Sequence, residues 1–231
     1  MTEIERNQRC SLRDPRVRAV LDRLHREARW DPLRFLHLVP RATLGLLRRK
    51  TFAEIISPAA MRSCYIPVSR DQGRFLYLTA RAVEAKRVVE FGTSFGISTI
   101  YLAATVRDNG GGIVIGTELE PSKRERAVAH LEEAGLGEVV EVRLGDALET
   151  LKEVPAPLDL LFLDGWKDLY LPLLELLAPR LRPGAVVLGD DILSFRKSLR
   201  PYVDYVQSGE KGFESTTLRI SDGIEYSLYV G

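Results

Sequence analysis

Several features that would place a protein in a membrane, outside the cell or around a metal are missing from this chain of 231 residues. It has no uninterrupted apolar run of about 18 residues, so we expect no transmembrane helix. The N-terminal stretch "MTEIERNQRC" is charged from its start and does not resemble a secretory signal peptide. The two cysteines, Cys10 and Cys64, have no metal-binding spacing and give no basis for a disulfide. We therefore expect a cytoplasmic protein with free thiols.

The chain also lacks a large net charge, although its charges are unevenly distributed. Residues 1–50 carry thirteen Lys and Arg against six Asp and Glu, a surplus of seven, and the formal total of +1 leaves −6 for the remainder. A basic arm can approach nucleic acid or an anionic surface. The alternatives are a solvated face, or a face that docks on the acidic remainder or on a second subunit. We expect one of these alternatives, with residues 1–63 forming a helical cap or an oligomerisation segment such as a homodimer contact.

No internal repeat interrupts the chain, and from residue 64 onwards strand patterns alternate with helix patterns. This alternation predicts right-handed βαβ units and a parallel sheet. Continuous apolar runs such as "LLFL" and "AVVL" are typical of strands buried on both faces. A turn at Asp222-Gly223 joins two final strand patterns, which predicts an antiparallel hairpin. We expect an α/β fold, a doubly wound, Rossmann-like sheet of about seven strands, formed by a domain over residues 64–231.

The expected elements follow directly from these patterns. Helices are predicted at 72–85, 94–109, 121–136, 147–154 and 169–181, after short helical pieces within 12–50. Strands are predicted at 87–92, 112–119, 140–146, 158–164, 185–191, 213–220 and 224–230, with "RPG" at 182–184 as a turn.

The turn after the first strand, "VVEFGTSFGIS", lacks the glycine spacing of phosphate-binding loops. Gly92 and Gly96 fit neither the dinucleotide fingerprint nor a Walker A motif. Acids lie on both sides of the turn instead, because Glu90 ends the first strand and Glu118 ends the second. An acid at the end of the second strand usually binds ribose hydroxyls. Two carboxylates with little phosphate-binding apparatus favour a positively charged nucleoside such as S-adenosylmethionine. The alternative is an ordinary tight turn with two surface acids.

A second group of acids follows the fourth and fifth predicted strands. Asp164 ends one strand and the pair Asp190 and Asp191 ends the other. Neighbouring strands lie roughly 4.8 Å apart, so these carboxylates should share a small volume and repel one another. A hard cation such as Mg²⁺, or Ca²⁺ or Mn²⁺, would relieve the repulsion. Alternatively, one aspartate caps a helix, another faces water, and Lys167 is only a neutralising partner.

Four stretches resemble the metal-dependent class I O-methyltransferases of the catechol O-methyltransferase group. They are "EFGTSFGIS", "GTELEPS", "FLDGWKDLYLP" and "RPGAVVLGDDI", and the resemblance extends from about Cys64 to Ile192. It implies S-adenosylmethionine and a divalent cation, with Asp164, Asp190 and Asp191 as metal ligands and Lys167 as the base. The resemblance thus implies that Asp164 is both a catalytic residue and a cofactor-binding residue. The remaining cofactor positions that it implies are Val68, Glu90, Gly92, Ser94, Gly96, Ser98, Glu118, Leu119, Asp146, Ala147 and Trp166.

The chain departs from the family pattern at specific positions. Asp191 stands where the family usually has asparagine, Gly165 replaces a larger residue, and Glu214 is the candidate for a late acid on the substrate side. The resemblance implies methyl transfer to a hydroxyl of a small, catechol-like or vicinal-dioxygen acceptor. Two alternatives remain open. One is methylation of a hydroxylated tRNA base, although no aromatic platform accompanies the basic arm; the other is a non-catalytic cofactor-binding subunit.

Overall fold

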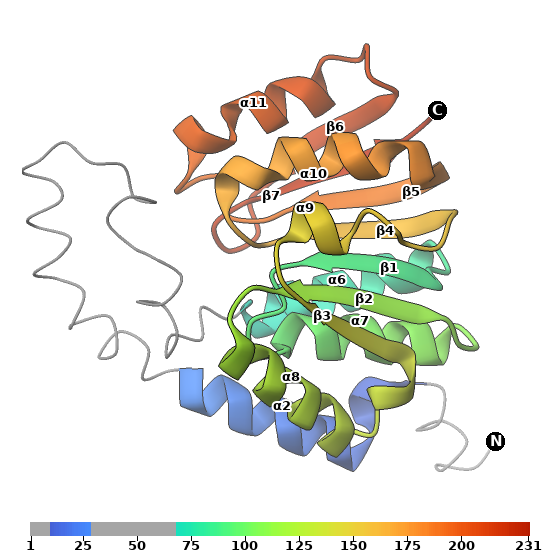
Figure 1. Ribbon diagram of the computed structural model, residues 1–231, viewed down its shortest axis with the longest axis vertical. Helices are drawn as coiled ribbons and strands as arrows, with labels where there is room; N and C mark the ends of the chain where they lie inside the picture. The colour runs from blue at the N-terminus through green and yellow to red at the C-terminus, as the bar shows by residue number, and fades with distance from the viewer. Residues whose placement is uncertain (1–9, 29–67) are drawn as a thin grey trace, which may run out of the picture.

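The computed structural model of the chain describes residues 10–28 and 68–231 (Figure 1). Cys64, together with residues 29–63 of the predicted N-terminal segment, lies outside the described residues. Within the described ranges, no helix is both long and apolar enough to cross a membrane. Cys10 is a free cysteine.

A seven-stranded sheet in the order β3-β2-β1-β4-β5-β7-β6 forms the centre of the molecule. The first five strands are parallel, and β7 pairs antiparallel with both β5 and β6. The predicted α/β sheet with its C-terminal hairpin is therefore confirmed. The strands are β1 (Arg87–Phe91), β2 (Ile113–Glu118), β3 (Val140–Leu144), β4 (Leu158–Leu163), β5 (Leu181–Gly189), β6 (Phe213–Leu218) and β7 (Ile224–Tyr229).

Helices cover both faces of this sheet (Figure 1). On one face α6 packs on α7, and on the other α10 packs on α11. The start of α6 is set by a capping box, in which Ser69 and Gln72 each accept a backbone N–H of the other. The α-helices of the sheet domain are α6 (Arg70–Ala82), α7 (Ile97–Asp108), α8 (Pro121–Glu133), α9 (Ala147–Thr150), α10 (Tyr170–Leu177) and α11 (Arg196–Gln207).

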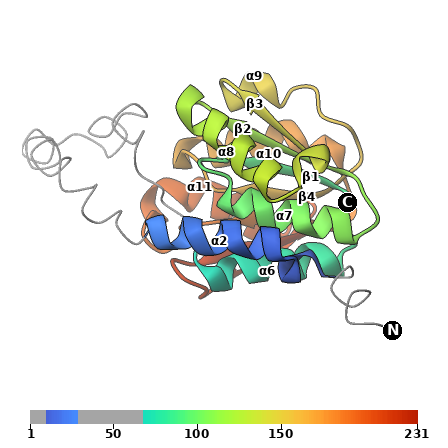
Figure 2. The same ribbon diagram turned by 90° about the horizontal axis from the view of Figure 1, so that it is seen from below.

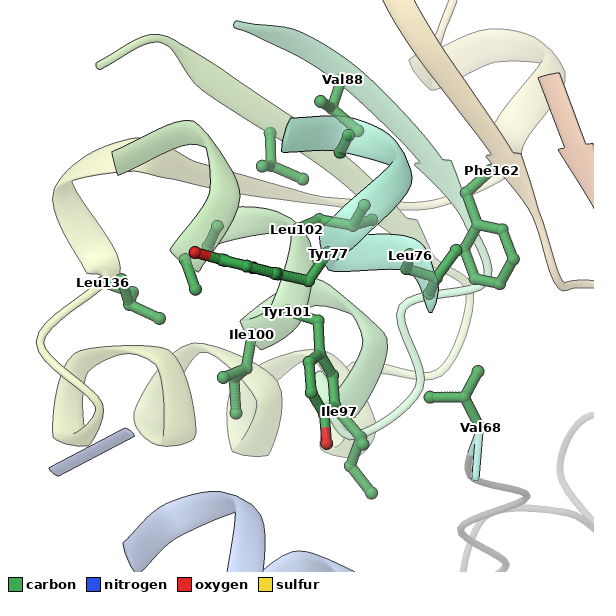
Figure 3. Packing of buried hydrophobic residues seen from close by; sticks show 14 of the residues in the cluster. Val68, Leu76, Tyr77, Val88, Ile97, Ile100, Tyr101, Leu102, Leu136 and Phe162 are labelled. Carbon is green, nitrogen blue, oxygen red and sulfur yellow. The ribbon is translucent and has the colours of Figure 1, made fainter. Parts of the chain in front are cut away.

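The central strands are apolar throughout because both of their faces are buried. In β4, Leu160 and Phe162 belong to the cluster under α6 and α7, whereas Leu161 and Leu163 belong to the cluster under α10 and α11. Successive strand side chains point to opposite faces, so a strand between two helical layers has no polar side. Figure 3 shows the first cluster, in which Phe162 of the sheet and Leu76 of α6 lie near Val68.

The described N-terminal residues pack on this helical layer. Helix α2 (Pro15–Ala28) lies against α7 and α8 (Figure 2). It buries Val17, Val20, Leu21 and Leu24. Arg23 adds two hydrogen bonds to the carboxylate of Glu133, at 2.8 and 2.6 Å. In residues 10–28, basic and apolar side chains thus contact the body of the same chain.

Two elements differ from the sequence-based expectation. Strand β5 begins at Leu181, so "RPG" lies inside the strand, and the β4–β5 register shifts between Leu158 and Leu160 to accommodate it. Helix α11 was not predicted, and it contains Pro201. Its signal is the spacing of Leu199, Tyr202 and Val206, which are buried on one face.

We expect Gly189→Ala to destabilise the fold by about 1–3 kcal/mol, the usual range for overpacking. A Cβ at this strand end would lie 2.7 Å from the Tyr202 ring, which is itself only 1% exposed. Gly137→Ala is the matched control, because its Cβ would meet nothing closer than 3.4 Å. Urea unfolding of both variants measures the difference, and equal stability of the two would contradict this account of the packing.

Candidate active site

The topology reverses direction between β1 and β4, where the chain leaves β1 towards β2 on one side and returns as β4 on the other. Open α/β sheets bind ligands outside the carboxyl ends of the strands at such a point. The strand pairing continues one residue beyond the strands here. Asp164 N donates to Phe91 O at 2.9 Å and Asp190 N donates to Leu163 O at 3.0 Å. Both aspartates are therefore held at the same edge.

A pocket of about 250 Å³ opens at this edge, and we call it the acidic pocket. Asp190 is 3% exposed, and both of its carboxylate oxygens lie 2.8 Å from Gln72 Nε2. Asp191 N also donates to Asp190 Oδ1 at 2.8 Å. The acidic pocket is lined by Val68, Ser69, Gln72, Asp164, Asp190, Asp191, Ser221 and Asp222.

Lys167 is the cation of this site. Its Nζ lies 2.7 Å from Asp191 Oδ2 and 3.8 Å from Asp164 Oδ1. It also donates to the Tyr170 hydroxyl at 2.8 Å, and that hydroxyl donates to the backbone oxygen of Asp190 at 3.2 Å. Lys167 thus connects the ends of β4 and β5, and its side chain is only 13% exposed.

One ammonium does not neutralise three carboxylates. Burial, and then the charge of Asp191, raises the pKa of Asp190 to about 6. Burial, and then the charge of Asp190, raises the pKa of Asp164 well above its ordinary value. These shifts mark a site where negative charge is held in a poorly solvated volume.

The donor set fits a hard divalent cation in charge and in chemistry, because three carboxylates with an excess of negative charge are typical ligands of Mg²⁺ or Ca²⁺. In residues 10–28 and 68–231, however, no three acidic, histidine or cysteine side chains are arranged to hold an ion together. Lys167 lies against two of the predicted ligands instead. The metal site remains a prediction.

The predicted cofactor side of the edge begins with Glu90, which is fully buried in β1. Its Oε2 accepts from the hydroxyls of Thr93, at 3.1 Å, and Thr99. Within the described ranges its Oε1 has no hydrogen-bond partner, and burial raises the pKa of this carboxyl. A buried carboxylate oxygen without a donor fits a ligand that carries an ammonium or hydroxyl group.

Glu118, at the end of β2, accepts backbone N–H groups from Ser94 and Glu120, both at 2.8 Å. These bonds fix the carboxylate beside the turn that follows β1. Leu119, the next residue, is 49% exposed although it is a large apolar side chain. An acid with a neighbouring exposed leucine suits a nucleoside, whose ribose is polar and whose base is flat and apolar.

The other predicted cofactor residues occupy the same edge with different local roles. Gly96, at φ +85°, is the N-cap residue of α7, and Ser98 is buried in the first turn of that helix. Asp146 caps α9, because its Oδ1 accepts from Leu148 N at 2.9 Å, and Ala147 is buried behind it. Trp166 is half-buried against the cluster under α10. The structure tests none of these as ligand contacts.

Steric crowding explains why Gly165 stands where the family pattern has a larger residue. A Cβ at this position would lie 2.5 Å from the Phe91 ring, so a larger residue does not fit beside that phenylalanine. Gly92 is equally constrained, because it has φ +99° and its Cβ would lie 2.5 Å from the backbone oxygen of Asp164.

Three non-glycine residues with positive φ lie around the candidate site. They are Ser94 at +50°, Asp191 at +64° and Ser221 at +50°. Such conformations are unfavourable for most side chains and tend to occur at functional sites. Asparagine and aspartate tolerate this region best, so Asp191 is compatible with a position where the family usually has asparagine.

The sequence did not identify two residues that contact the charged groups of the site, Gln72 and Tyr170. In the sequence Gln72 is only part of a helix-start pattern, Ser-x-x-Gln, and Tyr170 is only a residue of the helix predicted at 169–181. Glu214 does not reach the acidic edge. It pairs with Leu228, which pairs with Val186, three residues before the end of β5 and thus about 10 Å along the strand.

Comparisons with known proteins agree with this geometry. A family model described as a methyltransferase domain matches residues 89–192. The chain is 39% identical over 129 residues to a catechol O-methyltransferase of Mycobacterium tuberculosis, covering 55% of this chain and 58% of the relative. It is 33% identical over 138 residues to a catechol O-methyltransferase of Niastella koreensis, covering 58% and 62%. The chain thus spans less than two thirds of the length of these curated relatives.

A solved structure extends the similarity over more of the fold. The O-methyltransferase TomG of Streptomyces achromogenes, in complex with S-adenosylmethionine, matches with a TM-score of 0.66 and 30% identity. The match covers 72% of this chain and 82% of that protein. The sheet order, the acids at the strand ends and these similarities lead to one conclusion. The chain belongs to the class I S-adenosylmethionine-dependent O-methyltransferases, and its sequence is similar to those of the catechol O-methyltransferase group.

Proposed function

We propose that this protein transfers a methyl group from S-adenosylmethionine to a hydroxyl of a small acceptor with two neighbouring oxygens, with Lys167 as the base and a divalent cation, Mg²⁺ by preference, in the acidic pocket. The observation that carries the proposal is the placement of Lys167 against Asp164 and Asp191 at the switch point of the sheet. The names of the relatives, catechol and caffeoyl-CoA O-methyltransferases, support a catechol-like acceptor.

The residues on β1 and β2 would hold the cofactor. Glu90 offers a buried oxygen that has no partner among the described residues, and Glu118 is fixed by two backbone N–H groups. Gly92 lets the chain turn closely over the end of β4. When bound, S-adenosylmethionine supplies an electrophilic methyl group on a sulfonium. The protein contributes by orienting the acceptor towards it, since positioning supplies much of the rate of such transfers.

The residues on β4 and β5 would prepare the acceptor. A phenolic hydroxyl has a pKa near 10 and is a poor nucleophile at neutral pH. Lys167 would take its proton, and Tyr170 fixes the position of the lysine. Asp164, Asp190 and Asp191 would hold the cation. When bound, it would act as a Lewis acid for the acceptor oxygens and engage the carboxylates that now contact Lys167.

Glu118→Ala should weaken S-adenosylmethionine binding by about 1.5–3 kcal/mol, the range for a hydrogen bond to a charged group. Isothermal titration calorimetry measures the change. Glu138→Ala is the control, because Glu138 is an exposed acid outside the predicted site. Since Glu118 also accepts two backbone N–H groups, circular dichroism must establish that the variant is folded. Unchanged affinity in a folded variant would remove Glu118 from the cofactor site.

Lys167→Ala should lower turnover by about two to four powers of ten, as for other positioned acid–base groups, while cofactor affinity stays the same. The deficit should shrink for acceptors with more acidic hydroxyls, because these need less help in losing the proton. Initial rates with a series of substituted catechols measure this trend. Lys197→Ala on α11 is the control. An equal deficit for every acceptor would point to a positioning role instead.

Removing divalent metal with a chelator should abolish turnover but leave most of the cofactor binding, since the main predicted cofactor contacts, Glu90 and Glu118, lie on β1 and β2. Added Mg²⁺ should restore turnover. Asp164→Ala should be severe and Asp191→Asn mild, because an amide oxygen still coordinates a hard cation. Methyl transfer assays with and without chelator test this. Full activity in excess chelator would leave Lys167 and the aspartates as an ion-paired cluster in a metal-independent enzyme.

A further inference from the structure

A second pocket, of about 450 Å³, lies beside the acidic pocket and differs from it in charge. Four of the side chains that line it are charged, three arginines and one aspartate, and we call it the basic pocket. Its remaining lining is apolar or neutral. It is lined by Ile192, Leu193, Arg196, Arg200, Val203, Asp204, Gln207, Thr217 and Arg219.

The cations come from two directions. Arg196 and Arg200 are four residues apart, and with Val203 and Gln207 they follow the spacing of one helix face of α11. Arg219 comes from the opposite side, directly after the end of β6. Arg200 is paired with Asp204 at 3.3 Å, whereas Arg196 and Arg219 form no ion pair within residues 10–28 and 68–231. Among the described residues, the pocket therefore carries two guanidinium groups that are not engaged in an ion pair.

The two pockets are bordered by the same two loops. Asp191 lines the acidic pocket and Ile192, the next residue, lines the basic one. In the other loop, Arg219 lines the basic pocket and Ser221, two residues later, lines the acidic one. Backbone bonds join the two loops into one rim, from Ile192 N to Gly223 O at 3.1 Å and from Leu193 N to Asp222 O at 2.8 Å.

Lys167 provides a further link between the pockets. Its Nζ lies 5.4 Å from the ring centroid of Phe195, and Phe195 directly precedes Arg196. Phe195 N also donates to Asp191 O at 3.1 Å. The predicted base, which follows β4, thus contacts an aromatic ring that directly precedes the first arginine of the basic pocket in the loop after β5.

We propose that the basic pocket binds an anionic arm of the methyl acceptor, so that the substrate is a hydroxylated aromatic acid whose carboxylate or phosphate is held by Arg196 and Arg219. This inference rests on the proposed function and extends it to the class of acceptor. Guanidinium groups suit such anions because they donate paired hydrogen bonds in the geometry of carboxylate and phosphate oxygens. The volume lies within the range of small-ligand pockets, and Ile192, Leu193 and Val203 supply apolar lining for the arm.

The charge arrangement also explains how such an acceptor would be oriented. The hydroxyl end of the acceptor would face Lys167 and the proposed cation, whereas the anionic arm is attracted to the arginines of the basic pocket, beyond the rim.

The kinetic test compares three catechols that differ in the charge of one arm: 3-(3,4-dihydroxyphenyl)propionate, its neutral amide, and the corresponding amine. We expect the wild-type protein to prefer the acid. Arg196→Gln with Arg219→Gln should raise KM for the acid by about tenfold and leave kcat and the neutral amide nearly unchanged. Lys197→Ala, a loss of an exposed cation on the same helix that does not line the pocket, should have no effect. Equal changes for acid and amide, or no change for either, would overturn the proposal.

A binding experiment separates this proposal from the proposed function. Calorimetry with 3-phenylpropionate and with phenyl phosphate, neither of which can accept a methyl group on a phenolic oxygen, reports on the pocket even if no acceptor is methylated. The proposal requires that at least one of them binds and that the double arginine variant loses about tenfold in affinity. The probe that binds identifies the arm as carboxylate or phosphate. Absence of binding of both to the folded wild-type protein would overturn the proposal.

Discussion

The repulsion between three carboxylates at one edge of the sheet is the constraint on which the site depends. Asp164 and Asp190 follow hydrogen-bonded neighbouring strands, so the backbone holds them together whether or not their charges favour it. Lys167, the amide of Gln72 and the N–H of Asp191 offset part of the charge. Burial, and then the neighbouring carboxylates, still raises the pKa of both Asp164 and Asp190. The fold therefore places acidic groups at a point where burial disfavours their ionised form.

The edge divides into two halves that meet at Gly92. Glu90 and Glu118 lie on the β1–β2 side, and the aspartates with Lys167 lie on the β4–β5 side. At Gly92 the chain passes so close to the backbone oxygen of Asp164 that a side chain is excluded. Movement of the turn after β1 would therefore displace the end of β4 as well. The packing thus fixes the position of the predicted cofactor residues relative to the predicted base, and transfer between two bound groups depends on such positioning.

The edge is electrostatically asymmetric, because one side of the rim carries carboxylates and the other side carries arginines. The acidic pocket lies over the ends of β4 and β5, and the basic pocket lies between α11 and β6. Both are bordered by the loop after β5 and by the segment that connects β6 to β7. Changes in these two connections can therefore alter the recognition of an acceptor without disturbing the strands that carry Glu90, Glu118 and Asp164. In many proteins the binding residues lie on loops, while a rigid sheet holds those loops in place.

The sequence alone determined the alternation of strands and helices, the antiparallel hairpin and the positions of the acids at strand ends, because these follow from local periodicity. Strands buried on both faces have continuous apolar runs, and the residue after each run lies at the edge. Only the tertiary structure decided which distant side chains meet. Gln72 reaches Asp190 across 118 positions, and Lys167 reaches Asp191 through the pairing of β4 with β5. Helix α11, which was not predicted, carries two of the three arginines of the basic pocket, and Arg219 meets them from the end of β6. Such contacts depend on strand order and register, which place residues side by side without leaving any periodic signal in the sequence.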